Sequence, residues 1–172
     1  PIIPLKVQSF PVDVDRFNCL ESEDGLVKTD VFVYFKRRKP SELQVLENTL
    51  IERKINYKVF DYVKRYEEED YLEYLKKAKY GIILDAHESQ GFAIEEAMSC
   101  NVPLLVWNAT SMAQEDGINY PPYPATSIPY WDDMCGEVFT DWINEFDNVF
   151  EKFLRGVEER KYKPRDCIIN EL

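Results

Sequence analysis

The sequence predicts an α/β fold in which helices flank a parallel β-sheet. Short segments rich in β-branched and aromatic residues alternate with longer amphipathic segments between residues 30 and 107. Such alternation is typical of strand–helix–strand units. The segment 80–85, "YGIILD", is apolar along almost its whole length, as expected for a strand covered by helices on both faces. The chain of 172 residues suits a single domain, residues 1–172.

Residues 30–107 are expected to form four strands and three helices. Leu43, Leu46 and Leu50 share one stripe of the first helix, which Ser41 can cap. The second helix carries acidic residues in its first turn and lysines in its last, as the helix dipole favours. Asn101 can end the third helix in the left-handed conformation, and the proline two residues later prevents its continuation. The strands are 30–35, 56–62, 80–85 and 104–107, and the helices are 42–54, 67–78 and 91–100.

Residues 108–135 show no periodicity and contain "YPPYPATSIPYWDDMCG". A loop of this length is usually functional or disordered, and its aromatic residues argue against disorder. We expect it either to serve a functional site or to pack against the long C-terminal helix. The C-terminal helices are predicted within 141–172, after a short strand at 136–140. The longer helix has an apolar face formed by Trp142, Phe146, Val149, Phe150 and Phe153.

The composition limits the classes of partner. The net charge is −11, and so acidic a surface would repel nucleic acid and anionic membranes. We therefore expect no nucleic-acid binding, and no apolar run is long enough for a membrane span. No signal peptide is visible, and the start at Pro1 is consistent with an excised segment.

Cysteine and histidine usage argues against a metal site. Cys19, Cys100, Cys135 and Cys167 form no C-x-x-C pair, and His87 is the only histidine, so the common zinc-ligand spacings are missing. We expect no metal, and four reduced thiols that indicate a cytoplasmic protein. The chain also has no recognisable serine or cysteine nucleophile motif, so no catalytic triad is predicted.

Two polar segments fall at the carboxyl ends of predicted strands, where ligands bind in parallel sheets. "KRRK" (36–39) follows the first strand and "AHESQG" (86–91) follows the third. Glu88 and Glu96 bracket the N-terminus of the helix that begins near Gly91. The first N–H groups of this helix lack intrahelical partners and favour an anion, and the glycine lets a ligand approach closely. A phosphate on these amides, beside a carboxylate that accepts hydrogen bonds from a sugar diol, indicates a nucleoside diphosphate sugar.

The segment "ESQGFAIEEAMSCNVPLLV" (88–106) resembles the E-x7-E segment of retaining GT-B glycosyltransferases, especially the family 4-like group. That group commonly reads E-G-F-G-x-x-x-x-E-A-M-A-C-G-x-P-V-V. The two glutamates, the Glu-Ala-Met run, Cys100 and Pro103 are in step. The Gly-Phe pair lies two positions later than usual, and Asn101 replaces a glycine. "FPVDVDRF", "VFVYFKRRKP" and "AKYGIILDAHESQG" are similar to upstream parts of the same domain, so the resemblance covers most of residues 8–110.

This resemblance implies a Rossmann-like parallel sheet that forms the C-terminal, donor-binding half of a GT-B glycosyltransferase. The expected activity is retaining, metal-independent glycosyl transfer. The implied donor is a nucleotide diphosphate sugar, UDP- or GDP-linked, with no further cofactor. The acceptor, a glycan or another molecule, would bind an N-terminal domain of the parent protein, so the chain alone would be inactive.

The resemblance also implies roles for individual residues. Glu88 would contact the donor sugar, and Glu96 would bind the ribose diol. Lys36 and Arg38 would neutralise the diphosphate, although Arg37 or Lys39 could replace either. Glu88, Lys36 and Arg38 are thus the expected catalytic residues. The expected substrate-binding residues are Glu96, Gly91, Phe92, Ala93, Ser89, Gln90, His87 and Tyr62, the last of which would border the base.

Several of these residues have a purely structural alternative. Glu88 and Glu96 could be ordinary solvated acids, "KRRK" a surface charge run, and His87 a turn or packing residue. Glu95 is expected to be a solvated helix residue, and Phe92 and Met98 are expected in the core. Three other functions stay open: a nucleotide-sugar-binding module without independent activity, a flavodoxin-like protein-interaction domain, and a phosphorylase-like or epimerase-like GT-B relative.

Overall fold

A five-stranded parallel sheet forms the centre of the computed structural model, which describes residues 11–19 and 28–171. The strand order is β2-β1-β3-β4-β5, and every neighbouring pair is parallel. The predicted α/β class with a parallel, Rossmann-like sheet is therefore confirmed. The strands are β1 (Asp30–Lys36), β2 (Tyr57–Asp61), β3 (Ala78–Asp85), β4 (Leu104–Trp107) and β5 (Gly136–Phe139).

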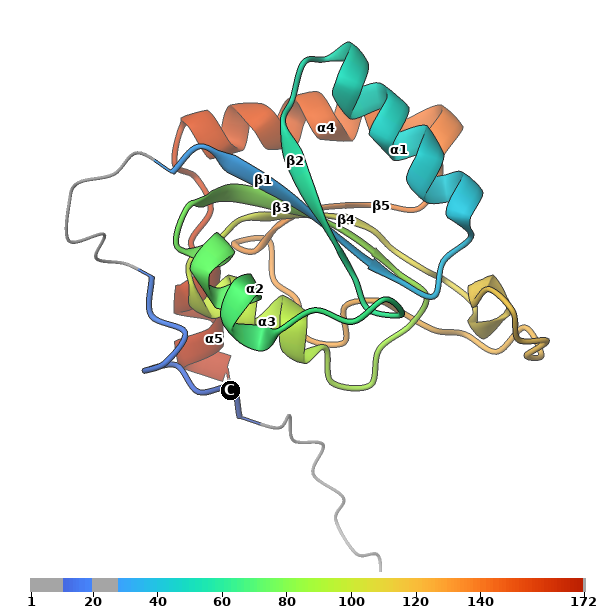
Figure 1. Cartoon of the computed structure of the whole chain (residues 1–172), viewed down its shortest axis with the longest axis horizontal. Coiled ribbons are helices and arrows are strands. Elements are labelled where there is room, and N and C mark those ends of the chain that lie inside the picture. The colour runs from blue at the N-terminus through green and yellow to red at the C-terminus, as the bar shows by residue number, and fades with distance from the viewer. Residues whose placement is uncertain (1–10, 20–27, 172) are drawn as a thin grey trace, which may run out of the picture.

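Helices cover both faces of the sheet (Figure 1). One face carries α1 and α4, and the opposite face carries α2, α3 and α5. Both faces are buried, which explains why the strand segments are apolar along nearly their whole length. The helices are α1 (Pro40–Glu52), α2 (Glu68–Leu75), α3 (Phe92–Ser99), α4 (Trp142–Glu158) and α5 (Pro164–Glu171), and a short 3-10 helix, η1, spans Met112–Gln114.

The alternation of side chains along each strand divides the interior into two cores. In β1, Val31 and Val33 belong to the core under α1 and α4, whereas Phe32 and Tyr34 belong to the core under α2, α3 and α5. The predicted leucine stripe of α1 and the predicted aromatic face of α4 both lie in the first of these cores. Both amphipathic predictions are therefore confirmed.

The helix ends agree only partly with the sequence predictions. Ser41 is not the cap of α1, because the helix already begins at Pro40. The carboxylate of Glu42 instead accepts a 3.2 Å hydrogen bond from the backbone N–H of Lys39. The predicted lysines of α2 follow its last residue, Leu75, rather than lying in its last turn. Asn101 does adopt the left-handed conformation after α3, with φ of 55°.

The expectation of four reduced thiols is wrong for one pair of cysteines. Cys19 and Cys100 form a disulfide across 81 residues of sequence, whereas Cys135 and Cys167 are free and buried. The pair meets because the segment 11–19 packs against the C-terminal end of α3. Arg165 of α5 holds the two together, donating hydrogen bonds to the carbonyl oxygens of Phe17 (3.2 Å) and Ser99 (2.6 Å). Spacing along the chain gives no sign of such packing.

The strand order reverses between β1 and β3, which is the topological switch point of the sheet. These two strands are neighbours, but the chain continues from β1 to β2 at one edge and from β3 to β4 on the other side. The crossovers therefore diverge, leaving a crevice beyond the carboxyl ends of β1 and β3, where ligands bind in open α/β sheets. Among the described residues, none of the helices is both long and apolar enough to cross a membrane.

A glycine substitution in β5 tests the packing of the sheet edge. Gly136 has φ of 147°, and a Cβ there would lie 1.8 Å from the carbonyl oxygen of its β4 partner Leu104. Because that atom belongs to the backbone, the strands must separate. We expect Gly136→Ala to lower the free energy of unfolding by roughly 3 kcal/mol, measured by denaturant unfolding.

The matched control is Gly117→Ala in the loop between β4 and β5. Gly117 also has a positive φ, 77°, but a Cβ there meets no atom within 4 Å. This substitution should cost only about 1 kcal/mol of backbone strain. Equal losses in the two variants would show that the close approach to Leu104 does not matter.

Candidate functional site

A cleft of about 890 Å³ lies at the carboxyl ends of β1, β2 and β3. It therefore occupies the crevice where the chain reverses between β1 and β3. Basic, acidic and aromatic side chains share its walls. The lining residues are Tyr34, Lys36, Arg37, Tyr62, Val63, Arg65, Tyr66, Glu68, Glu88, Ser89, Gln90, Gly91, Phe92, Ala93 and Glu96.

The N-terminus of α3 forms one wall of the cleft. Gly91 precedes the helix with φ of 84° and ψ of 42°, a left-handed conformation that suits glycine. Its carbonyl oxygen accepts the first bonds of the helix, 2.9 Å from the nitrogens of both Ile94 and Glu95. The hydroxyl of Tyr71 in α2 donates a 2.8 Å hydrogen bond to the carbonyl oxygen of Ala93, which fixes this helix end. The partial positive charge of the helix terminus therefore faces the cleft.

Lys36, the last residue of β1, is surrounded by carboxyl groups and an aromatic ring. Its ammonium group forms an ion pair with Glu88 and lies 3.7 Å from a carboxyl oxygen of Asp85. It also lies 4.9 Å from the ring centroid of Tyr62, within cation–π range. The side chains of Glu88 and Lys36 are only 13% and 14% exposed, respectively. Lys36 and Glu88 thus form a partly desolvated pair inside the cleft.

Asp85 lies beneath this ion pair at the end of β3. Its carboxyl group is fully buried, and neither oxygen has a hydrogen-bond partner within the described residues. Burial raises the pKa of Asp85 to about 9, although the charge of Lys36 opposes the shift. At neutral pH Asp85 therefore keeps its proton, and Glu88 is the counter-ion of Lys36.

Glu96 lines the cleft from the second turn of α3. Burial raises its pKa to about 7, and the nearby carboxylate of Glu68 adds to the shift. The solvated-acid alternative therefore does not describe Glu96. The side chain can accept hydrogen bonds at the cleft wall, and near neutral pH it is partly protonated.

Glu95 is not the solvated helix residue that the sequence suggested. It is 2% exposed, and neither of its carboxyl oxygens has a hydrogen-bond partner in the part of the chain that the structure describes. Burial raises its pKa to about 7, with a further contribution from the charge of Glu88. The expectation was wrong because the helical period shows which residues share a face, whereas tertiary packing decides which surface covers that face.

Phe92 also differs from its expected place in the core. Its side chain is 50% exposed at the cleft, whereas Met98 is buried as expected.

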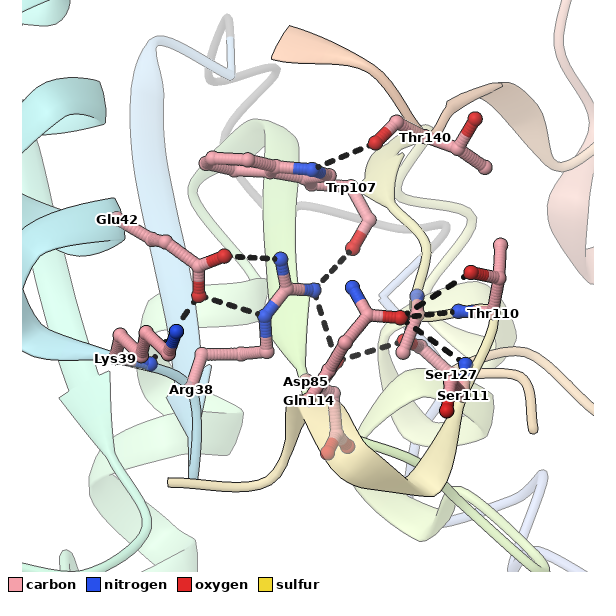
Figure 2. A network of polar contacts seen from close by, with 11 residues as sticks. Arg38, Lys39, Glu42, Asp85, Trp107, Thr110, Ser111, Gln114, Ser127 and Thr140 are labelled. Atoms are coloured by element: carbon pink, nitrogen blue, oxygen red, sulfur yellow. Dashed lines mark hydrogen bonds and ion pairs between the residues drawn. The ribbon is translucent and has the colours of Figure 1, made fainter. Parts of the chain in front are cut away.

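Arg38 does not line the cleft, although it was expected to bind the diphosphate. Its side chain points between α1 and the end of β4 (Figure 2), and it is 1% exposed. The guanidinium donates to both carboxylate oxygens of Glu42 (2.8 and 2.9 Å) and to the carbonyl oxygen of Trp107 (3.1 Å). Arg38 therefore joins β1, α1 and β4. The neighbouring Arg37, which the sequence left as an alternative, lines the cleft instead.

The site also includes a residue that the sequence did not single out. Glu115 lies in the loop between β4 and β5, and its side chain is 1% exposed. One carboxylate oxygen is 3.1 Å from a guanidinium nitrogen of Arg37, and the other is 2.6 Å from Nε2 of His87. His87 does not line the cleft; it bonds Glu115 and packs on the ring of Tyr120. No local signal in the featureless loop could have identified Glu115, because its partners lie 78 and 28 residues away.

Most of the predicted site residues are thus brought together. Only Arg38 and His87 of the predicted set lie outside the lining, and Lys39 also lies outside it. No group of three or more metal-ligating side chains occurs among the described residues. The predicted residues that line the cleft are Lys36, Tyr62, Glu88, Ser89, Gln90, Gly91, Phe92, Ala93 and Glu96.

The chain matches no protein-family model, and its comparison with curated proteins gives no match. Inference of function therefore depends on the chemistry of the cleft.

Replacement of Glu95 tests the burial of an unpartnered carboxyl. The pKa of Glu95 is about 7 in the fold against an ordinary value of 4.5. Between these two pKa values, Glu95 keeps its proton in the folded state and loses it in the unfolded state. The contribution of this proton to the free energy of unfolding is therefore lost as pH rises from about 4.5 to about 7. Glu95→Gln should match the wild type near pH 4 and exceed its free energy of unfolding by roughly 2 kcal/mol at pH 8.

Urea unfolding at several pH values measures this difference. The control is Glu52→Gln on α1, since Glu52 is exposed and should show no pH-dependent gain. A Glu95→Gln variant that is less stable than the wild type at pH 8 would contradict the buried, uncompensated state of Glu95.

Proposed function

We propose that this chain is the donor-binding domain of a retaining GT-B glycosyltransferase and that its ligand is a nucleoside diphosphate sugar. One observation carries the proposal. The two glutamates of the E-x7-E segment, Glu88 and Glu96, line the same cleft as Lys36 and Arg37, across the N-terminus of α3. The spacing that resembles the family motif thus coincides with a cleft that has suitable chemistry.

The diphosphate would lie between the start of α3 and the two basic side chains. The helix terminus supplies N–H groups and a partial positive charge, and Gly91 keeps the approach open. Lys36 and Arg37 supply basic groups on the opposite side, although Lys36 is paired with Glu88 and Arg37 with Glu115. This local charge matters because the net charge of the chain is −11, which would otherwise repel an anion.

The two glutamates would recognise hydroxyl groups on either side of the diphosphate. Glu96, in the second turn of α3, would accept hydrogen bonds from the ribose diol. Glu88, held by Lys36, would contact hydroxyls of the donor sugar. Each charge-assisted hydrogen bond contributes about 1.5–3 kcal/mol where water is excluded. The exposed ring of Tyr62 would border the base from the end of β2.

The proposed chemistry is transfer of the sugar with retention of configuration. Lys36, Arg37 and the α3 dipole would stabilise the charge that develops on the departing diphosphate. Because the protein supplies these charges itself, we propose that transfer needs no metal. The acceptor would bind a separate N-terminal domain, so this chain by itself would bind the donor and transfer nothing.

The strand order favours one second candidate. The order β2-β1-β3-β4-β5 is that of flavodoxin-like folds, which bind the phosphate of FMN at the same reversal point. A flavodoxin-like module would bind flavin mononucleotide or serve protein contacts, and it would not need Glu88 or Glu96. The ligand preference therefore separates the two candidates.

Calorimetric titration with UDP, GDP, ADP and FMN tests the proposal. At pH 8 one nucleoside diphosphate should bind, and Glu96→Gln should weaken its affinity by about tenfold because the ribose loses an acceptor that is mostly ionised above its pKa of about 7. Glu67→Gln, an exposed acid before α2, should bind like the wild type. Equal weakening in both variants would remove the ribose role of Glu96, and a preference for FMN would favour the flavodoxin-like candidate.

A second titration tests the diphosphate site. Lys36→Met should weaken binding of a nucleoside diphosphate by at least about tenfold, since one charge-assisted contact is lost. The same variant should change the affinity for the bare nucleoside little. Lys39→Met serves as the control, because Lys39 lies outside the cleft lining. A loss of affinity for nucleoside and diphosphate alike would contradict a phosphate contact by Lys36.

A further inference from the structure

The loop between β4 and β5, residues 108–135, has a fixed local structure. Ser111 and Pro124 form an antiparallel bridge, and Met112 donates a 2.9 Å backbone hydrogen bond to Tyr123. The side chain of Gln114 accepts hydrogen bonds from the backbone nitrogens of Thr110 (2.7 Å) and Ser111 (3.0 Å). The residue that follows η1, Glu115, is therefore presented from an ordered turn.

Glu115 lies between the ends of two adjacent strands. Arg37 follows β1 and His87 follows β3, and these strands pair with Lys36 opposite Asp85. The carboxylate of Glu115 uses one oxygen for each of these two residues. It thus bridges the two strand ends that bound the cleft, although Glu115 itself does not line the cleft.

Backbone contacts from the same loop reinforce this bridge. Asp116, next to Glu115, donates a 2.8 Å hydrogen bond from its backbone N–H to the carbonyl oxygen of Arg37. Arg37 has φ of 52°, a left-handed conformation that needs such support outside glycine. Further along the loop, the carbonyl oxygen of Thr126 accepts a 2.9 Å hydrogen bond from the backbone N–H of Glu88. The loop therefore holds both the basic and the acidic side of the cleft.

The contact with Glu115 leaves most of the Arg37 guanidinium available. Only one of its nitrogens bonds Glu115, and arginine has five N–H donors in a rigid fork. The Arg37 side chain is 46% exposed, and its guanidinium carbon lies 5.7 Å from the ring centroid of Tyr62 on the cleft wall. One guanidinium nitrogen of Arg37 is thus anchored on a buried carboxylate, while the rest of the group remains available at the cleft. Such anchoring reduces the entropy that the arginine loses when it binds an anion.

We infer that Glu115 is a positioning residue for the anionic part of the ligand, which it serves by holding Arg37 at the cleft. This inference extends the proposed function, because the ligand group that Arg37 would meet is the diphosphate of the donor. The substrate never touches Glu115. Its contribution appears only through Arg37, which distinguishes it from an independent binding contact and from general support of the fold.

A double-mutant cycle measures this dependence. The ligands are UDP, GDP, ADP, the matching nucleosides and inorganic pyrophosphate, titrated by calorimetry into the wild type, Glu115→Gln, Arg37→Met and the double variant. We expect Glu115→Gln to weaken diphosphate binding about tenfold and nucleoside binding little. The double variant should bind no more weakly than Arg37→Met alone. Asp133→Asn, an exposed acid in the same loop, should bind like the wild type.

Thermal unfolding of each variant separates a local effect from a loss of fold. If Glu115→Gln does not fold, Glu115→Asp replaces it in the cycle, because aspartate keeps the charge. The cycle then consists of the wild type, Glu115→Asp, Arg37→Met and the corresponding double variant. Additive losses, an unchanged affinity in the Glu115 variant, or equal losses for nucleoside and diphosphate would overturn the inference. Each of these results would leave the proposed function standing.

Failure of the proposed function gives a different result. If the wild type binds no nucleoside diphosphate but binds pyrophosphate, and this binding depends on Glu115 only through Arg37, the positioning role is supported without a nucleotide. If the wild type binds neither, both the proposed function and the positioning role are overturned.

Discussion

The parallel pairing of β1 with β3 is the constraint on which the site depends. Their register places Lys36 opposite Asp85 at the carboxyl ends of the strands. Since the chain leaves these two ends in opposite directions, no crossover covers them, and the residues that follow each strand face the same space. Arg37 from one strand end and Glu88 from the other therefore meet around one cleft. A different strand order would separate them.

The cleft of this acidic chain is less negative than its composition suggests. Asp85 keeps its proton at neutral pH because it is buried, and burial also raises the pKa of Glu96 to about 7. Glu88 is neutralised by Lys36. The cleft also contains the side chains of Arg37, Arg65 and Glu68 and the dipole of α3, and Arg37 is itself paired with Glu115. Burial of carboxyl groups thus lets an acidic surface contain a place where an anion can bind.

The loop between β4 and β5 packs against the core that includes α5 and contacts the ends of β1 and β3. Trp131 and Ile128 pack against the core under α2, α3 and α5 and not against that of α4, so the alternative of packing on the long helix is wrong. Glu115, Asp116 and Thr126 connect this loop to the ends of β1 and β3. The loop has few regular elements because its polar groups form hydrogen bonds with neighbouring segments and within its own turns.

The sequence by itself determined the elements of this protein and the composition of its candidate site. Apolar periodicity defined the strands and the faces of α1 and α4, and Asn101 marked the end of α3, because these features depend on neighbours a few residues away. The E-x7-E spacing likewise placed Glu88 and Glu96 around one helix terminus. Only the tertiary structure decided that Arg37 rather than Arg38 faces the cleft, that Glu95 is buried, that Cys19 meets Cys100, and that Glu115 holds Arg37. Each of these outcomes depends on a partner or a packing surface far along the chain, and local periodicity carries no record of such pairings.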